Sequence, residues 1–190
     1  SQIADLRVIW GGDETIRFFK KFLTKPKSID VVFPNRNSLA IISSSFLKDK
    51  KDYEINSLAQ SFANDIALFS QRACSSPKRI IIFDKNTELS KLRTTFNSFL
   101  KLCDSHIANI DNLELYHTLD NFKKASEISA FFKDSFSTFK GKNLFAIYME
   151  DKLNSNFEIN ITFENTCLVI YTISNLNEIS ESLPKDNQTI

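Results

Sequence analysis

The stretch SQRACSSPKRIIIF, residues 70–83, carries the strongest signal for the fold. It ends in an apolar run without alternation, which is typical of a strand buried on both faces of a parallel sheet. A helical pattern over residues 53–71 leads into it, with apolar residues at helical spacing. Between helix and strand lies Cys74, beside small residues and a proline. We expect this loop to expose the thiol.

Outward from this stretch, apolar runs and helical spacing alternate along the chain. Strands are predicted over residues 6–10, 29–33, 39–43, 79–83, 144–149, 157–163 and 167–173. Helices are predicted over residues 13–23, 53–71, 86–103, 118–139 and 176–183. Strands that alternate with helices predict an α/β fold, a mostly parallel sheet with helices on both faces. The strands at 157–163 and 167–173 would form a hairpin at one edge.

The composition is that of an ordinary globular protein. Of 190 residues, 42% are hydrophobic and 25% charged, and the net charge is +1. This balance gives no reason to expect nucleic acid or an anionic membrane as a partner. No apolar run approaches the ~18 residues of a membrane span. Three cysteines in a domain of this size do not make a disulfide scaffold and indicate a reducing cytoplasm.

Cys74 is the candidate nucleophile. The neighbouring cations Arg72, Lys78 and Arg79 would favour its thiolate form. The carboxyl end of the preceding helix would disfavour it, because that end of the helix dipole is negative. The residues alone therefore leave two readings open, a reactive thiol and a small filler without a chemical role.

The other thiols and the imidazoles have weaker claims. Cys103 closes a helical pattern and Cys167 opens an apolar strand, so both are interpreted as packing residues. His106 and His117 stand apart from the cysteines, in a pattern that fits no metal site, and we expect them at the surface.

Gly11 and Gly12 stand between a predicted strand and a predicted helix. Such a turn presents backbone N–H groups that suit a phosphate or the close approach of a ligand. A plain strand-to-helix turn would need the same two residues, so both interpretations remain.

Four segments in order resemble one enzyme superfamily. Residues 62–74, which include Phe62, Asn64, Gln71 and Cys74, followed by SP and RIIIF, resemble the nucleophile region of the aldehyde dehydrogenases. The form QRACSSP is similar to that of the long-chain acyl-CoA reductases, the fatty acid reductases of bacterial luminescence. WGGDETIRFF resembles the end of the superfamily's cofactor domain, and FPNRNSLAII the start of its catalytic domain. The closing NLNEISESLPKDNQTI is also similar to the reductases.

The resemblance implies an aldehyde dehydrogenase-like catalytic domain and an oxidoreductase that makes a long-chain aldehyde. Cys74 would take an acyl group from acyl-CoA or an acyl carrier, and NADPH would reduce the acyl-cysteine, with Gly11 and Gly12 near the cofactor. It further implies a homo-oligomer or a multi-enzyme complex. A related enzyme that uses another acyl donor, such as an acyl phosphate, and a catalytically silent binding domain are the alternatives.

Two positions depart from the superfamily's pattern. Aldehyde-oxidising members carry a glutamate at a place that falls near Val32 here, and the stretch VVF has no acid. Water should therefore attack the acyl-enzyme slowly, which suits a reductase. The glutamate that holds the cofactor ribose has no clear match either, although Glu164 lies nearby in the sequence.

The resemblance divides the chain into residues 1–27, the end of a cofactor domain, and residues 28–190, the catalytic domain. The sequence opens without Met, almost directly in a strand, which predicts a fragment of a longer protein. By itself such a fragment should show little turnover, since most of the dinucleotide site would be missing.

Overall fold

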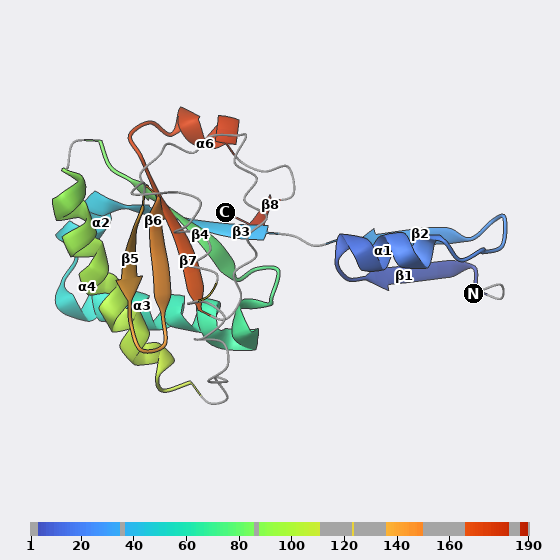
Figure 1. Ribbon diagram of the computed structural model, residues 1–190, viewed down its shortest axis with the longest axis horizontal. Coiled ribbons are helices and arrows are strands. Elements are labelled where there is room, and N and C mark those ends of the chain that lie inside the picture. The colour runs from blue at the N-terminus through green and yellow to red at the C-terminus, as the bar shows by residue number, and fades with distance from the viewer. Residues whose placement is uncertain are drawn as a thin grey trace. The chain divides into compact units, whose positions relative to one another are not determined.

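The computed structural model describes residues 4–34, 37–85, 88–110, 123, 136–149, 166–182 and 187–189. It divides into two compact units, Ser1–Arg36 and Asn37–Ile190, whose elements are labelled in Figure 1. Among the described helices, none is long and apolar enough to cross a membrane.

The first unit is a strand, a glycine turn, a helix and a second strand. Its elements are β1 (Leu6–Trp10), α1 (Asp13–Lys20) and β2 (Ile29–Phe33). The strands are parallel, with Leu6 opposite Ile29. Gly11 has a φ of +156°, and a Cβ added there would lie 2.9 Å from the Thr15 side chain. Only glycine fits this position without strain, which explains the turn that the sequence predicts.

An ion pair joins the two strands of this unit. The Arg7 guanidinium donates to both carboxylate oxygens of Asp30, at 2.8 and 2.6 Å. These bonds lower the pKa of the Asp30 carboxyl. Because β2 pairs with β1, the first unit extends to Arg36. The first compact unit therefore includes strand 29–33 and ends nine residues after position 27. The division into a cofactor domain, residues 1–27, and a catalytic domain, residues 28–190, stays a prediction.

The second unit is built on one sheet, and its described strands have the order β5-β6-β7-β4-β3-β8. They are β3 (Asn37–Ser43), β4 (Pro77–Phe83), β5 (Phe136–Lys140), β6 (Phe145–Met149), β7 (Cys167–Ile173) and β8 (Asn187–Thr189). All neighbouring pairs are parallel except β5 with β6. The mostly parallel sheet predicted from the sequence is therefore confirmed.

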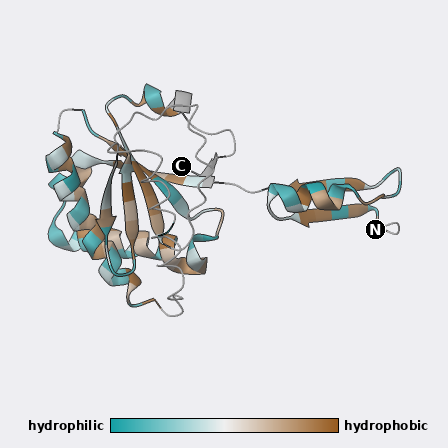
Figure 2. Ribbon diagram, viewed as in Figure 1, coloured by the Kyte–Doolittle hydropathy of each residue, from teal (hydrophilic) through white to brown (hydrophobic). Residues whose placement is uncertain are grey.

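Helices lie on both faces of this sheet. They are α2 (Ser44–Asp49), α3 (Asp52–Ala67), α4 (Leu89–Ile107) and α6 (Asn177–Ser182). α3 and α4 pack over the face to which β4 contributes Ile80 and Ile82. On the opposite face, Ile179 of α6 packs with Ile81. Figure 2 shows apolar central strands and helices that are hydrophilic on their outer sides.

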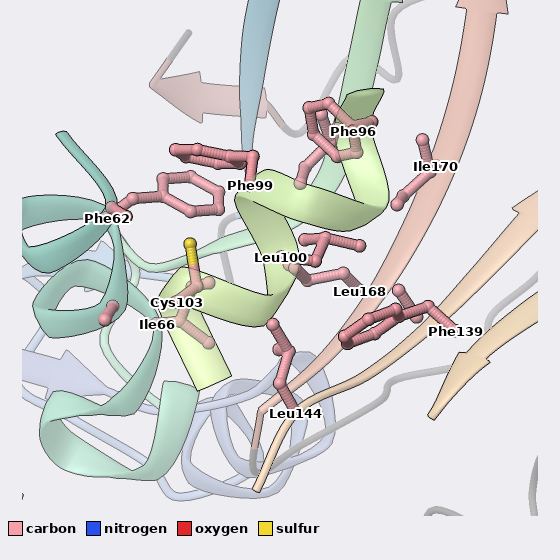
Figure 3. Packing of buried hydrophobic residues seen from close by; sticks show 14 of the residues in the cluster. Phe62, Ile66, Phe96, Phe99, Leu100, Cys103, Phe139, Leu144, Leu168 and Ile170 are labelled. Carbon is pink, nitrogen blue, oxygen red and sulfur yellow. The ribbon is translucent and has the colours of Figure 1, made fainter. Parts of the chain in front are cut away.

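The main core lies between α3, α4 and the sheet. Phe62 of α3 meets Phe99 of α4 with ring centroids 5.8 Å apart, and Phe96 lies 5.6 Å from Phe99 (Figure 3). The Cys103 side chain points into the same cluster and is fully buried. These are the residues that helical spacing places on the apolar faces, so the sequence pattern and the packing agree.

Two sequence expectations for the sheet edge are wrong. Residues 136–139 were expected at the end of the helix 118–139, but they belong to β5, which pairs with β6 and gives the sheet its antiparallel edge. Strand 167–173 was expected at an edge, but β7 lies between β6 and β4. Its expected hairpin partner, residues 157–163, lies outside the described residues. The hydrophobic pattern of a strand does not predict which other strand it pairs with in the sheet.

The turn between β5 and β6 is held by Asp104 of α4. Its Oδ1 accepts hydrogen bonds from the backbone N–H groups of Asn143 at 2.6 Å and Leu144 at 2.8 Å, and Oδ2 accepts one from Lys142 at 3.2 Å. A Cβ on Gly141 would lie 2.3 Å from Oδ1. Glycine is required here because the carboxylate approaches the backbone so closely.

We expect Asp104→Ala to lower the free energy of unfolding by ~2 kcal/mol, because it leaves three backbone donors without a charged acceptor. Urea denaturation of the full-length protein measures this loss. Asp65→Ala on the exposed side of α3 is the matched control, and its effect should stay within about 0.5 kcal/mol. If Asp104→Ala lowered the free energy of unfolding no more than the Asp65→Ala control does, the Asp104 hydrogen bonds would contribute nothing to stability.

Candidate active site around Cys74

The chain leaves α3 through a sharp backbone break. The 3-10 segment η1 (Leu68–Gln71) follows the helix. Within it, Phe69, Ser70 and Gln71 have φ values of 57°, 52° and 59°. Three successive non-glycine residues in the left-handed region are unfavourable, at roughly 1–2 kcal/mol each. Such a conformation persists only where surrounding contacts fix it.

The side chain of Gln71 supplies such contacts. It is fully buried. Its Nε2 donates to the carbonyl oxygens of Pro77 at 2.9 Å and Cys167 at 2.8 Å, and its Oε1 accepts from the Cys167 N–H at 3.1 Å. One amide therefore joins the base of the loop to the beginnings of β4 and β7. Nothing in the helical periodicity marks Gln71 for this structural role, so the sequence does not predict it.

Cys74 lies in the turn that follows η1, residues 73–76. The turn is closed by a hydrogen bond from the Ser76 N–H to the Ala73 carbonyl at 3.0 Å. The Ser38 hydroxyl of β3 donates to the Cys74 carbonyl at 2.6 Å. The Cys74 side chain itself is exposed. The backbone of the loop is thus held at both ends while its thiol remains accessible, as the sequence predicted.

The cations near Cys74 in the sequence differ in their surroundings. Arg72 is exposed, whereas Lys78 and Arg79 are half-buried on β4. Arg79 lies near Tyr171: burial raises the pKa of this phenol, and the charge of Arg79 opposes the rise. At least one of the three cations therefore interacts with the sheet.

Cys103 and Cys167 are fully buried, and burial raises the pKa of the Cys103 thiol to about 12. Both are packing residues, which confirms the sequence interpretation. His106 contacts the side chain of Asn56 at 3.0 Å at the surface. His117 lies outside the described residues.

Gly11 and Gly12 belong to the first unit. The Gly11 N–H donates to the Phe33 carbonyl at 3.3 Å, and the Gly12 carbonyl accepts from Ile16 at 3.0 Å, so the turn leads directly into α1. A Cβ on Gly12 would meet open space. The N–H groups of the first turn of α1 have no partners within the helix and can donate hydrogen bonds to an anionic group. Asp13 and Glu14 lie in the same turn, and their negative charges would oppose that anion.

Comparison with known proteins assigns the family. The model of the acyl-CoA reductase (LuxC) family matches residues 1–188. A long-chain acyl-protein thioester reductase of Aliivibrio fischeri is 33% identical over 87 residues, which cover 45% of this chain and 16% of the relative.

Solved structures show the fold. An indole-3-acetaldehyde dehydrogenase in complex with NAD+ has a TM-score of 0.57 at 14% identity, over 100% of this chain and 39% of its own. The betaine aldehyde dehydrogenase of Staphylococcus aureus has a TM-score of 0.59 at 14% identity, over 95% of this chain and 37% of its own. The chain thus spans less than half the length of these relatives, and it has their aldehyde dehydrogenase-like fold. With a family model that matches almost every residue, the chain belongs to the acyl-CoA reductase (LuxC) family.

Proposed function

We propose that this chain is the catalytic part of an NADPH-dependent acyl-CoA reductase, which makes a long-chain aldehyde through an acyl-cysteine at Cys74. The observation that carries the proposal is an exposed thiol on a loop whose backbone is held by Ser38 and Gln71. Family membership supports the reaction class. A nucleophile needs both properties, access for the substrate and a fixed position.

The proposed acyl transfer begins at the Cys74 sulfur. The thiolate attacks the thioester carbonyl carbon, a new C–S bond forms, and the bond to the carrier sulfur breaks. The carrier leaves as a thiolate and takes up a proton. The backbone N–H of Cys74 is the proposed donor to the developing oxyanion. Sulfur suits both steps because it is a good nucleophile and a good leaving group.

The aldehyde dehydrogenase fold implies a nicotinamide cofactor. Some features of the Gly11–Gly12 turn favour binding of the cofactor phosphates, and others oppose it. Gly12 offers open space, and the first-turn N–H groups of α1 offer donors. Because Asp13 and Glu14 oppose a phosphate, we propose contact through the backbone alone. NADPH, when bound, supplies the hydride that reduces the acyl-cysteine. The resulting thiohemiacetal collapses to the aldehyde and returns the Cys74 thiolate.

The stretch VVF, residues 31–33, carries no acid at the place where aldehyde-oxidising relatives have their base, and this supports a reductase. Val32 is half-buried in β2, and the nearest acid in that strand, Asp30, is paired with Arg7. The guanidinium holds the pKa of Asp30 below its usual range, so this carboxylate is a poor proton acceptor. Slow deacylation by water would leave the acyl-enzyme to wait for hydride.

The test uses the full-length protein with a long-chain acyl-CoA and NADPH, and measures the aldehyde by gas chromatography. We expect aldehyde in an amount equal to the NADPH consumed, and less with NADH. Parallel reactions with an acyl phosphate and an acyl-protein thioester identify the donor, since the Aliivibrio fischeri relative is named for the latter. Free fatty acid as the main product would contradict a reductase, and no turnover with any donor would favour a silent domain.

Location and assembly are part of the same proposal. Three free cysteines and thiol chemistry suit a reducing cytoplasm. Transfer of an acyl group from a carrier suits a homo-oligomer or a multi-enzyme complex, in which the acyl group passes between sites. Size-exclusion chromatography with light scattering measures the assembly.

A further inference from the structure

Two neighbouring strands of the larger sheet are followed by helices that pack on opposite faces of that sheet. β4 and β7 are adjacent and parallel. After β4, the chain continues into α4, which packs on the face that contains Ile80. After β7, it continues into α6, whose Ile179 packs with Ile81 on the other face. The carboxyl ends of β4 and β7 therefore form a topological switch point, where open α/β sheets bind ligands.

A cavity of about 260 Å³ lies at this place. Its walls include Asp84 and Lys85 after β4, Arg93 of α4, Tyr148 of β6 and Ser174 after β7. The Asp84 N–H donates to the Ile173 carbonyl at 3.0 Å, which joins the two strand ends beneath it. The cavity is thus built on regular elements that the core holds.

This cavity is separate from the Cys74 loop. The loop precedes β4, whereas Asp84 and Lys85 follow it. The two sites therefore lie at opposite ends of a seven-residue strand, about 20 Å apart at the rise of an extended chain. A ligand of the size of the cavity cannot reach both.

The charges in the cavity favour an anion. The Arg93 guanidinium carbon lies 5.7 Å from the centre of the Tyr148 ring. The Lys85 ammonium nitrogen lies 5.8 Å from the centre of the Phe83 ring. Asp84 is the acidic member, but its side chain is only 5% exposed. It accepts a hydrogen bond from Ser44 and lies 3.9 Å from Lys48, so its charge has partners outside the cavity. Among the described lining residues, the cationic Arg93 and Lys85 outnumber the one acidic residue, Asp84.

The remaining lining suits a small organic body. Leu89, Met149 and Ile173 contribute apolar surface, and Thr172 and Ser174 contribute hydroxyl groups. Ligand sites commonly combine apolar walls with a few polar groups that fix orientation. A guanidinium and an ammonium beside such walls match a phosphate or carboxylate head on an apolar body.

We propose that the cavity at the carboxyl ends of β4 and β7 is a second ligand site, which binds a small organic anion with a phosphate or carboxylate head. The proposal stands on the geometry of the second unit and does not depend on the proposed function. Arg93 and Lys85 would bind the head group, and Leu89 and Met149 would contact the body.

Isothermal titration of the full-length protein with phenyl phosphate, benzoate, inorganic phosphate and benzyl alcohol tests the site. We expect phenyl phosphate or benzoate to bind more tightly than inorganic phosphate, and benzyl alcohol not to bind. The ratio of the first two identifies the preferred head group. Absence of binding by both aromatic anions at ~10 mM would overturn the proposal, since even a weak specific site is occupied at that concentration.

Variants locate the binding. Arg93→Gln and Lys85→Gln should each weaken binding of the preferred anion by about tenfold, the size expected for one charged hydrogen bond. Lys101→Gln, an exposed position on α4, is the matched control and should leave binding unchanged, and so should Cys74→Ala. Unchanged binding in the Lys85 variant, whose side chain is exposed, and in a folded Arg93 variant would overturn the assignment.

Discussion

Replacement of Cys74 by alanine will abolish acyl transfer to the full-length protein, with a loss of about a thousandfold or more. The side chain is exposed on the turn between η1 and β4, so no core packing is lost. The free energy of unfolding should therefore change by less than about 0.5 kcal/mol. Incubation with a radiolabelled long-chain acyl-CoA, followed by denaturing electrophoresis, measures the acyl-enzyme directly.

Ser75→Ala is the matched control, because Ser75 is exposed in the same turn. It should keep normal labelling. Alkylation with iodoacetamide under native conditions adds a second control: Cys74 should react, whereas Cys103 should not, because burial raises the pKa of Cys103 to about 12 and removes it from solvent. Acyl label retained in the Cys74→Ala protein would reject this residue as the nucleophile.

The central strands and the two long helices of the larger unit could be predicted from the sequence for a physical reason. The run Ile80–Ile82 of β4 and most of β7 are buried on both faces, so these stretches must be apolar, and such runs are easy to recognise. α3 and α4 bury one side each and show helical spacing. These patterns, with Cys74 between them, were enough for the fold class and for an exposed thiol at a helix-to-strand junction.

What the sequence did not predict depends on partners far apart in the chain. β2 has a strand pattern, but nothing in it says that it pairs with β1 and not with the larger sheet. Residues 136–140 have no clear strand pattern of their own. They form a strand because they pair with β6, and the sequence does not show that pairing. The Gln71 side chain bonds to Cys167, 96 residues away. A polar residue at the end of a helical pattern gives no signal of such a contact.

Gln71→Leu is expected to lower the free energy of unfolding by about 3 kcal/mol or more. The substitution keeps a similar volume, but it removes the three hydrogen bonds from Gln71 to the Pro77 carbonyl and to both backbone groups of Cys167. Each buried polar group left unsatisfied costs roughly 1–3 kcal/mol. Gln60→Leu on the exposed side of α3 is the matched control. The midpoint of urea denaturation measures the difference between the two variants.

The same substitution should also affect the Cys74 loop. Without the amide, the left-handed conformation of Phe69, Ser70 and Gln71 loses the contact that fixes it, so the loop should sample other positions. We expect acyl labelling of Cys74 to slow by about tenfold in protein that is still folded, since small displacements of a nucleophile are costly. Hydrogen exchange at the Cys167 amide, which bonds directly to Gln71, should accelerate in parallel. Faster exchange with unchanged labelling would show that Gln71 stabilises the sheet but does not position the thiol.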